Sequence, residues 1–248
     1  MPKLVVLGCA HAIPDENHEN THLALIGEHR RVLIDCVGNP VVRLKQAGVD
    51  INSLTDLFLT HFHPDHVSGV PSLLMSMWLL GRRTPLDIYG LHYTLDRIEK
   101  LMGFYEWDQW PDFFPTVFHR LPSEQMTLAL DCDEFRIFTS PVNHLIPTVG
   151  LRIEATQSKR VLAYSCDTEP CEAVVELAAG AEILIHEATG EHQGHSSASQ
   201  AGGVAAQAEV RDLYLIHYDP QAKDLIGMAK KEFPGPIFLA EDFMEINI

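Results

Sequence analysis

Three histidines and one aspartate lie within six residues of one another near position 60. They are His61, His63, Asp65 and His66. They follow the apolar run Leu57–Thr60, which predicts a short buried strand. Neutral imidazole and carboxylate together form the ligand set of zinc, and also of manganese and iron. Four polar groups at the end of a buried strand would be costly without such a partner, so the segment predicts a metal centre.

Three further candidate ligands each come just after another short apolar run. They are His144, Asp167 and His217. Ligand sites gather beyond the carboxyl ends of strands in α/β sheets, so these side chains are expected at the same edge. Alternation along an extended segment points His61 and His63 the same way. Asp65 and His66 stand where the chain turns into a helix and can face a second centre, so the seven residues predict a site for two metal ions.

The elements that must position these ligands alternate between short apolar runs and helical stretches, which predicts a single α/β domain over residues 1–248. The predicted strands are Leu4–Leu7, His22–Ile26, Arg31–Asp35, Leu57–Thr60, Leu86–Tyr89, Thr127–Leu130, Phe135–Thr139, Val149–Glu154, Arg160–Tyr164, Glu182–Ile185, Leu213–Ile216 and Ile237–Leu239. The predicted helices are Pro40–Ala47, Val67–Leu80, Tyr93–Met102, Glu172–Ala179, Ser199–Glu209 and Ala222–Glu232.

Aromatic residues are concentrated in residues 103–118, which hold seven aromatic side chains and two prolines. We interpret this segment as an aromatic cluster that packs a long loop onto the core. The alternative is a lid or subunit-contact segment beside the metal site, within an insertion over residues 81–122.

Charge and cysteine content limit the partners and the compartment. The chain has 18 basic and 34 acidic residues and a formal net charge of −16. Two divalent ions would leave about −12, which argues against an extended nucleic-acid surface. Five widely spaced cysteines without a CxxC pair predict no disulfide framework and favour the reducing cytoplasm. The start shows no signal peptide, and no apolar stretch is long enough for a membrane span.

Several segments resemble a known family. Residues 56–69, DLFLTHFHPDHVSG, resemble the HxHxDH motif of the metallo-β-lactamase superfamily. Four further segments resemble, more narrowly, ribonuclease Z and its phosphodiesterase relatives. They are NHLIPTVGLR (143–152), LAYSCDT (162–168), IHEATGEHQGHSSASQ (185–200) and LIHYDP (215–220). The resemblance implies a four-layer αββα sandwich. It also implies one metal at His61, His63 and His144, a second at Asp65, His66 and His217, and Asp167 as the bridge.

By the same resemblance the chain is expected to be a dinuclear metal-dependent hydrolase, a ribonuclease Z-like phosphodiesterase. Two divalent ions about 3.5–4 Å apart could share a hydroxide, because metal ions lower the pKa of water from 15.7 toward about 7. That hydroxide is the expected nucleophile, and Asp65 would orient it or accept its proton. Open metal positions would stabilise the charge that develops on the phosphoryl oxygen. Zinc is the expected metal, with manganese or iron as alternatives.

A phosphodiester also needs a proton for its leaving oxygen, and the resemblance implies His195 as the acid. The alternative is a loop histidine before a helix cap, since the serines that follow are good N-cap residues. Glu187 is expected either to orient His195 or to be a structural carboxylate. Asp35 ends a strand, where it could accept a hydrogen bond from a ligand histidine or cap a turn. His11, His22 and His186 could line the pocket or be structural.

The chain also departs from ribonuclease Z. Only 22 residues separate His144 from Asp167, enough for two strands and a turn but not for the arm that grips tRNA. Cys166 stands where the family usually has glycine, and the opening loop carries Cys9, Ala10 and His11 in place of glycines. The expected substrate is therefore a small phosphodiester or an exposed RNA end.

Three other functions stay open at this point. A carbonyl hydrolase of the same fold, such as a lactonase or thioesterase, could use the same ligands and would not need His195. A tRNA 3′-processing endonuclease would require a basic patch, and the basic residues occur as pairs rather than clusters. A metal-holding scaffold would require a sealed site, and a redox di-iron role is disfavoured by His63, where such relatives carry glutamate. Relatives of this kind are often dimers, so a homodimer is also expected.

Overall fold

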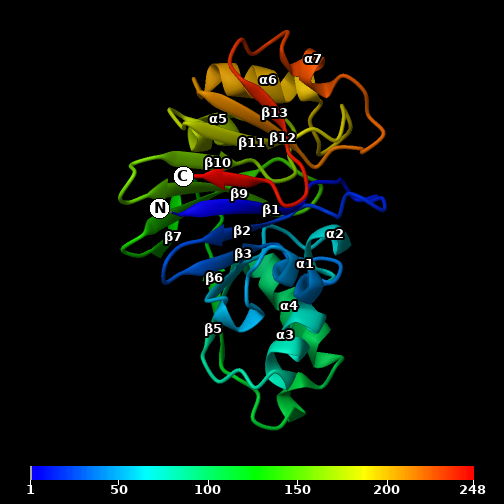
Figure 1. Ribbon diagram of the computed structural model, residues 1–248, viewed down its shortest axis with the longest axis vertical. Helices are drawn as coiled ribbons and strands as arrows, with labels where there is room; N and C mark the ends of the chain where they lie inside the picture. Colours follow the sequence, from blue (N-terminus) through cyan, green and yellow to red (C-terminus); the bar gives the residue numbers. More distant parts are fainter. Residues whose placement is uncertain (1) are drawn as a thin grey trace.

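Two seven-stranded sheets lie face to face in the computed structural model, which describes residues 2–248 (Figure 1). The first sheet has the order β14-β1-β2-β3-β4-β5-β6. Its strands are β1 (Lys3–Gly8), β2 (His22–Ile26), β3 (Arg31–Ile34), β4 (Asp56–Phe58), β5 (Leu86–Leu91), β6 (Thr116–Leu121) and β14 (Glu245–Asn247). The pairs from β14 to β3 are antiparallel and the pairs from β3 to β6 are parallel.

The second sheet repeats this plan in the order β13-β12-β11-β10-β9-β8-β7. Its strands are β7 (Thr127–Asp131), β8 (Phe135–Val142), β9 (Thr148–Ala155), β10 (Val161–Tyr164), β11 (Ile183–Glu187), β12 (Asp212–Ile216) and β13 (Ile237–Leu239). The pairs from β7 to β10 are antiparallel and the pairs from β10 to β13 are parallel.

Helices cover the outer faces of both sheets. The first sheet carries α1 (Pro40–Gln46), α2 (Pro64–Val67), α3 (Val70–Leu79) and α4 (His92–Gly103), and the second carries α5 (Glu172–Ala178), α6 (Ala198–Gln207) and α7 (Leu225–Ala229) (Figure 1). The alternation along β1 shows how the layers form: Leu4 and Val6 join the core between the sheets, whereas Val5 and Leu7 join the core under the helices. The predicted four-layer αββα sandwich is therefore confirmed.

The predicted strands all occur, with ends displaced by a few residues, but some elements differ from the prediction. β6 lies partly inside the segment predicted as a long aromatic loop, and β14 was not predicted. The helix predicted over Val67–Leu80 occurs as α3, which begins three residues later because Ser68 and Gly69 separate it from the preceding α2. Gly69 lies against the backbone of Cys36, where an added Cβ would come within 3.0 Å of the carbonyl group. The helix predicted over Ala222–Glu232 shortens to α7.

The aromatic segment packs in part onto the helical layer. Phe114 is buried, and Trp107, Trp110 and Phe113 pack partly buried against the same core. Phe104 is 85% exposed. Residues 81–122 also contain β5, α4 and β6, so much of this stretch extends the first sheet. Within the described residues, no helix is both long and apolar enough to cross a membrane.

The contact between α6 and α7 predicts opposite effects for two adjacent glycines. An alanine Cβ at position 202 would lie 2.5 Å from the carbonyl oxygen of Ala229, whereas no atom lies within 4 Å of the same point at Gly203. We expect Gly202→Ala to lower the free energy of unfolding by about 1–3 kcal/mol through overpacking. Gly203→Ala, the matched control in the same helix, is expected to raise it by up to about 1 kcal/mol. Urea denaturation measures both values, and equal effects would contradict the close packing of the two helices.

Candidate metal centre

Strand ends bring the seven predicted ligands together at one edge of the sandwich. The segment with His61, His63, Asp65 and His66 follows β4 in the first sheet. His144, Asp167 and His217 follow β8, β10 and β12 of the second sheet. Because β10, β11 and β12 are parallel, their carboxyl ends meet at the same edge. The site therefore lies where the two sheets face each other, and neither sheet alone supplies all the ligands.

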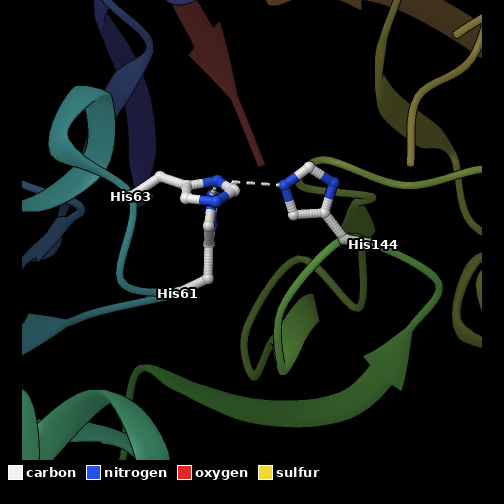
Figure 2. A group of neighbouring side chains, drawn as sticks. All are labelled: His61, His63 and His144. Carbon is white, nitrogen blue, oxygen red and sulfur yellow. Dashed lines mark hydrogen bonds between the residues drawn. The ribbon is translucent and has the colours of Figure 1, made fainter. Parts of the chain in front are cut away.

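One group of ligand atoms is made by three imidazoles. His61 Nε2 lies 3.1 Å from His63 Nδ1, and His144 Nε2 lies 3.1 Å from the same atom. Figure 2 shows the three rings directed at a common point, with His144 approaching from the side opposite to His63. The three imidazoles come from both sheets, and their nitrogen atoms could provide three ligands to one metal ion.

The second group combines two imidazoles with two carboxylates. His66 Nε2 lies 3.7 Å from Asp65 Oδ2 and 3.4 Å from Asp167 Oδ2. His217 Nε2 lies 3.5 Å from each of the same two oxygens. Four ligands around one zinc ion at bond lengths of 2.0–2.2 Å lie about 3.3–3.6 Å apart in a tetrahedron. The observed separations therefore fit one small divalent ion.

Asp167 connects the two groups. Its Oδ2 lies 3.9 Å from His61 Nε2 and 4.0 Å from His144 Nε2, in addition to its contacts with His66 and His217. The carboxylate is 2% exposed, and its Oδ1 has no hydrogen-bond partner among the described residues. His66 Nε2 and His217 Nε2 are also buried without partners. Buried polar atoms that converge without hydrogen bonds are expected of metal ligands, so the side chains present fit two ions.

The electrostatics of the site indicate the same need for positive charge. Burial alone would lower the pKa of His66, but Asp167 and Asp35 on either side raise it well above its ordinary value. Burial and the neighbouring imidazole of His66 hold the pKa of His61 well below its ordinary value. The surroundings of His61 thus favour a neutral imidazole, whereas the carboxylates beside His66 favour a positive charge. Metal ions at the two ligand groups would satisfy both conditions.

Hydrogen bonds behind the ligands turn their lone pairs toward the centre. His144 Nδ1 donates to the carbonyl oxygen of Gly194 at 2.7 Å. His217 Nδ1 donates to Thr189 Oγ1 at 2.9 Å, because the Thr189 hydroxyl itself donates to the carbonyl of His217. Each bond places the ring proton on Nδ1 and leaves Nε2 free for a metal.

Asp35 organises the ligands of the first sheet. Its Oδ2 accepts a hydrogen bond from His66 Nδ1 at 2.7 Å, and its Oδ1 accepts one from the backbone N–H of Thr60 at 2.8 Å. The Thr60 hydroxyl donates to the same carboxylate and lies 3.1 Å from His61 Nδ1. Of the two interpretations of Asp35, the structure favours the acceptor for a ligand histidine.

His195 lies at the junction of the two ligand groups. Its ring centroid is 4.9 Å from that of His144 and 5.9 Å from that of His217. Its Nδ1 lies 2.9 Å from Glu187 Oε1. Burial opposes a charged His195 ring, but the hydrogen bond and the charge of Glu187 raise its pKa above the ordinary value. The buried Glu187 carboxylate also accepts from the backbone N–H groups of Thr168 and Thr189, so its orientation beside His195 is fixed.

Other residues with two interpretations lie around the centre rather than in it. His22 is buried and donates to the carbonyl of Asn20, and burial lowers its pKa to about 4. His186 is buried and bonded to the Glu187 carbonyl. The half-buried His11 is bound through its backbone to Tyr218. Cys166 is buried with its Sγ 3.7 Å from His61 Nδ1, and burial raises the pKa of this thiol well above its ordinary value.

Sequence reasoning did not identify Thr60, Thr189 or Gly194. Thr60 had a usable signal, because it is a polar residue next to a ligand at the end of an apolar run. Thr189 and Gly194 had none, since a threonine hydroxyl and a backbone carbonyl become acceptors for a ligand histidine only once the loop after β11 is folded.

Comparisons with known proteins agree with this architecture. The family model of the beta-lactamase superfamily domain matches residues 30–218. Ribonuclease Z of Methanothermobacter thermautotrophicus is 28% identical over 100% of this chain and 97% of its own length. That alignment spans 308 positions against 248 residues here, so 60 positions have no residue in this chain.

Two solved structures are similar over almost their whole length. The short form of human tRNase Z has a TM-score of 0.80 and 25% identity, with 99% of each chain covered. The metallo-beta-lactamase fold protein YhfI of Bacillus subtilis has a TM-score of 0.84 and 21% identity, covering 99% of this chain and 98% of its own. The predicted resemblance to this fold and to ribonuclease Z is thus confirmed.

The hydrogen bonds of Asp35 predict a loss of metal affinity when its charge is removed. We expect Asp35→Asn to weaken metal binding about 10–100-fold, because an amide no longer accepts from both Thr60 and His66 with full strength. Asp133→Asn, at an exposed position, is the matched control. Elemental analysis and competition with a chromogenic chelator measure occupancy and affinity. Equal metal affinity in the two variants would contradict this role of Asp35.

Proposed function

This chain belongs to the β-lactamase superfamily, and on that premise we propose that it is a dinuclear metal-dependent hydrolase that cleaves small phosphodiesters or exposed RNA ends. The observation that carries the proposal is the pair of ligand groups joined by Asp167, with the Glu187–His195 pair beside them. Lactone or thioester hydrolysis does not require a proton donor at the position of His195. A phosphodiester with a poor leaving group does.

Metal binding is assigned to the seven predicted ligands. His61, His63 and His144 would hold one divalent ion, and Asp65, His66 and His217 the other, with Asp167 shared between them. Zinc is the proposed metal because nitrogen and carboxylate ligands at tetrahedral spacing suit it, and manganese or iron are the alternatives. When bound, the two ions would supply Lewis acidity toward the phosphoryl oxygen and lower the pKa of water from 15.7 toward about 7.

The protein's own groups would then handle two protons. Asp65 is partly buried beside His217 and would orient the attacking water and accept its proton. His195 would donate a proton from Nε2 to the leaving oxygen, since Nδ1 is engaged by Glu187. Glu187 touches no reacting atom and acts by holding the His195 ring in this orientation.

Large RNA is a less suitable substrate than a small diester. The chain between His144 and Asp167 forms only β9, a short turn and β10, and the 60 unmatched positions in the alignment show that the relative is longer. The net charge of −16 also opposes a long polyanion. We therefore propose a substrate bound mainly at the metal centre rather than along an extended surface.

The cysteines bear on the location of the protein. All five cysteines lie in the described part of the chain as free thiols, which supports a cytoplasmic location. The homodimer and the lid or subunit-contact role of residues 81–122 stay predictions.

The proton-donor role predicts that the loss caused by His195→Ala depends on the leaving group. With a dinucleotide, whose leaving group is an alcohol, we expect kcat/KM to fall about 10²–10⁴-fold. With bis(p-nitrophenyl) phosphate the fall is expected to be much smaller, because p-nitrophenolate leaves without a proton. Asp65→Ala should reduce both activities, and His192→Ala, at an exposed position in the same loop, should reduce neither.

The result that would overturn the proposal is turnover of a chromogenic lactone or thioester, but of neither diester, with His195 dispensable. The protein would then be a carbonyl hydrolase of the same fold.

The proposed binding of the substrate mainly at the metal centre predicts a weak dependence on salt. A protein that makes six to ten phosphate contacts loses about 10³–10⁵ in affinity between 50 and 200 mM salt. We expect the kcat/KM of this enzyme for a dinucleotide to change less than about threefold over that range, because few phosphates are contacted. Precursor tRNA cleavage that is faster than dinucleotide cleavage and steeply salt-dependent would show instead that the protein is a tRNA-processing endonuclease.

A further inference from the structure

A cavity of about 560 Å³ adjoins the metal centre on the side of His144. Its walls come from the loop between β8 and β9, the loop before α6 and the end of β5. His144 and Gly194 belong to both the cavity wall and the centre, since the His144 ring donates to the Gly194 carbonyl and turns Nε2 toward His63. This cavity, which we call the side cavity, therefore borders the metal centre at the ring of His144.

The charge of the side cavity excludes a second phosphate. Among the described residues that line it there is no lysine or arginine, and Glu169 is the only acidic side chain. An anionic group placed there would face a carboxylate without a counter-ion, which is costly at a partly desolvated site. The occupant is therefore not an anion.

Aliphatic and amide side chains both line the side cavity, which suits an occupant that has apolar faces and hydrogen-bonding edges. Leu91, Leu145 and Ile146 supply aliphatic contact surface. The exposed side-chain amides of Asn143 and Gln193 also line the cavity, where they are accessible to a ligand. Heterocycles combine apolar faces with donor and acceptor edges, and the volume lies within the usual range of about 300–1,000 Å³ for small-molecule pockets.

Glu169 determines which hydrogen-bonding edge of a heterocycle fits the side cavity. Its Oε1 accepts a hydrogen bond from the backbone N–H of Gly194 at 2.8 Å. No group of residues 2–248 donates to its Oε2, so this oxygen is free to accept one from a ligand. A carboxylate accepts from the exocyclic amino group of a base and repels a carbonyl oxygen at the same place.

We propose that the side cavity binds the nucleobase of the substrate and prefers bases with an exocyclic amino group, such as cytosine, over uracil. The inference rests on the proposed function for the bond that is cleaved, and it names the substrate as a nucleoside phosphodiester with no further phosphate on the His144 side. Cytidine and uridine differ at the 4-position by an amino group and an oxygen, so they isolate the contact with Glu169.

Binding of nucleosides to the metal-loaded protein tests the inference without any reaction. Isothermal titration calorimetry should show cytidine binding about tenfold tighter than uridine. Glu169→Gln keeps an acceptor for Gly194 and replaces Oε2 with an NH₂ donor, so the preference should disappear or reverse. Glu191→Gln, at an exposed position in the loop after β11, is the matched control and should keep it.

A second variant tests the apolar wall. Leu145 is 55% exposed, so Leu145→Ala should fold normally and weaken the binding of both nucleosides about tenfold. Leu128→Ala removes the same atoms from a residue that is 48% exposed on β7 and does not line the cavity, and it should change neither affinity.

Three results would overturn the inference: no binding of either nucleoside, an unchanged preference in Glu169→Gln, or ribose 5-phosphate binding as tightly as cytidine 5′-monophosphate. The failure of the proposed function is a separate result. Nucleoside binding with the expected preference but no cleavage of any phosphodiester would contradict the hydrolase and leave the base site standing. Diester cleavage without a base preference would do the reverse.

Discussion

A single carboxylate oxygen, Asp167 Oδ2, lies within 4.0 Å of four imidazole nitrogens and is buried from water. An isolated buried carboxylate would be strongly unfavourable, and neutral imidazoles that direct lone pairs at it would make this worse. Cations between these groups would relieve both effects. The other features of the site follow from this requirement, because each ligand must present a lone pair and each ring proton must be directed outward.

The two-sheet architecture meets that requirement by closing the site between layers. The first sheet supplies Asp35 and the ligands that follow β4, and the second supplies the ligands that follow β8, β10 and β12. Parallel strands end at the same edge, so side chains distant in sequence meet there without long connecting loops. Relative displacement of the two sheets would separate His63 from His144, which lie 3.1 Å apart across the interface. Packing of the core between the sheets therefore contributes directly to the geometry of the metal centre.

The candidate ligands that the structure brings together could be found in the sequence because their signals are local. Each polar residue stands next to an apolar run, and the run predicts a strand whose end is a site. The segment His61–His66 was also recognisable as a motif. β14 was missed because a strand of three residues, of which only Ile246 is buried, has little periodicity. The division between α2 and α3 was missed because it depends on the approach of Gly69 to Cys36, a contact between segments 33 positions apart. Glu169 was missed because its free oxygen becomes significant only beside Gly194.

Backbone conformation gives a physical meaning to one departure from the family pattern. Asp35, Cys166 and His217 have φ values of 60°, 54° and 52°, in the left-handed region, and all three stand at strand ends that line the site. Such a conformation costs a non-glycine residue of order 1–3 kcal/mol and is retained where surrounding contacts determine it. Aspartate tolerates it best, and His217 is held by the bond of its N–H to the Cys9 carbonyl. At position 166 a glycine would remove the cost, which gives a physical reason for the glycine usual there in ribonuclease Z. The thiol in this chain instead fills space beside His61, at 3.7 Å from its Nδ1. In this chain the same turn is thus made by a non-glycine residue in the left-handed region, with its side chain buried beside His61.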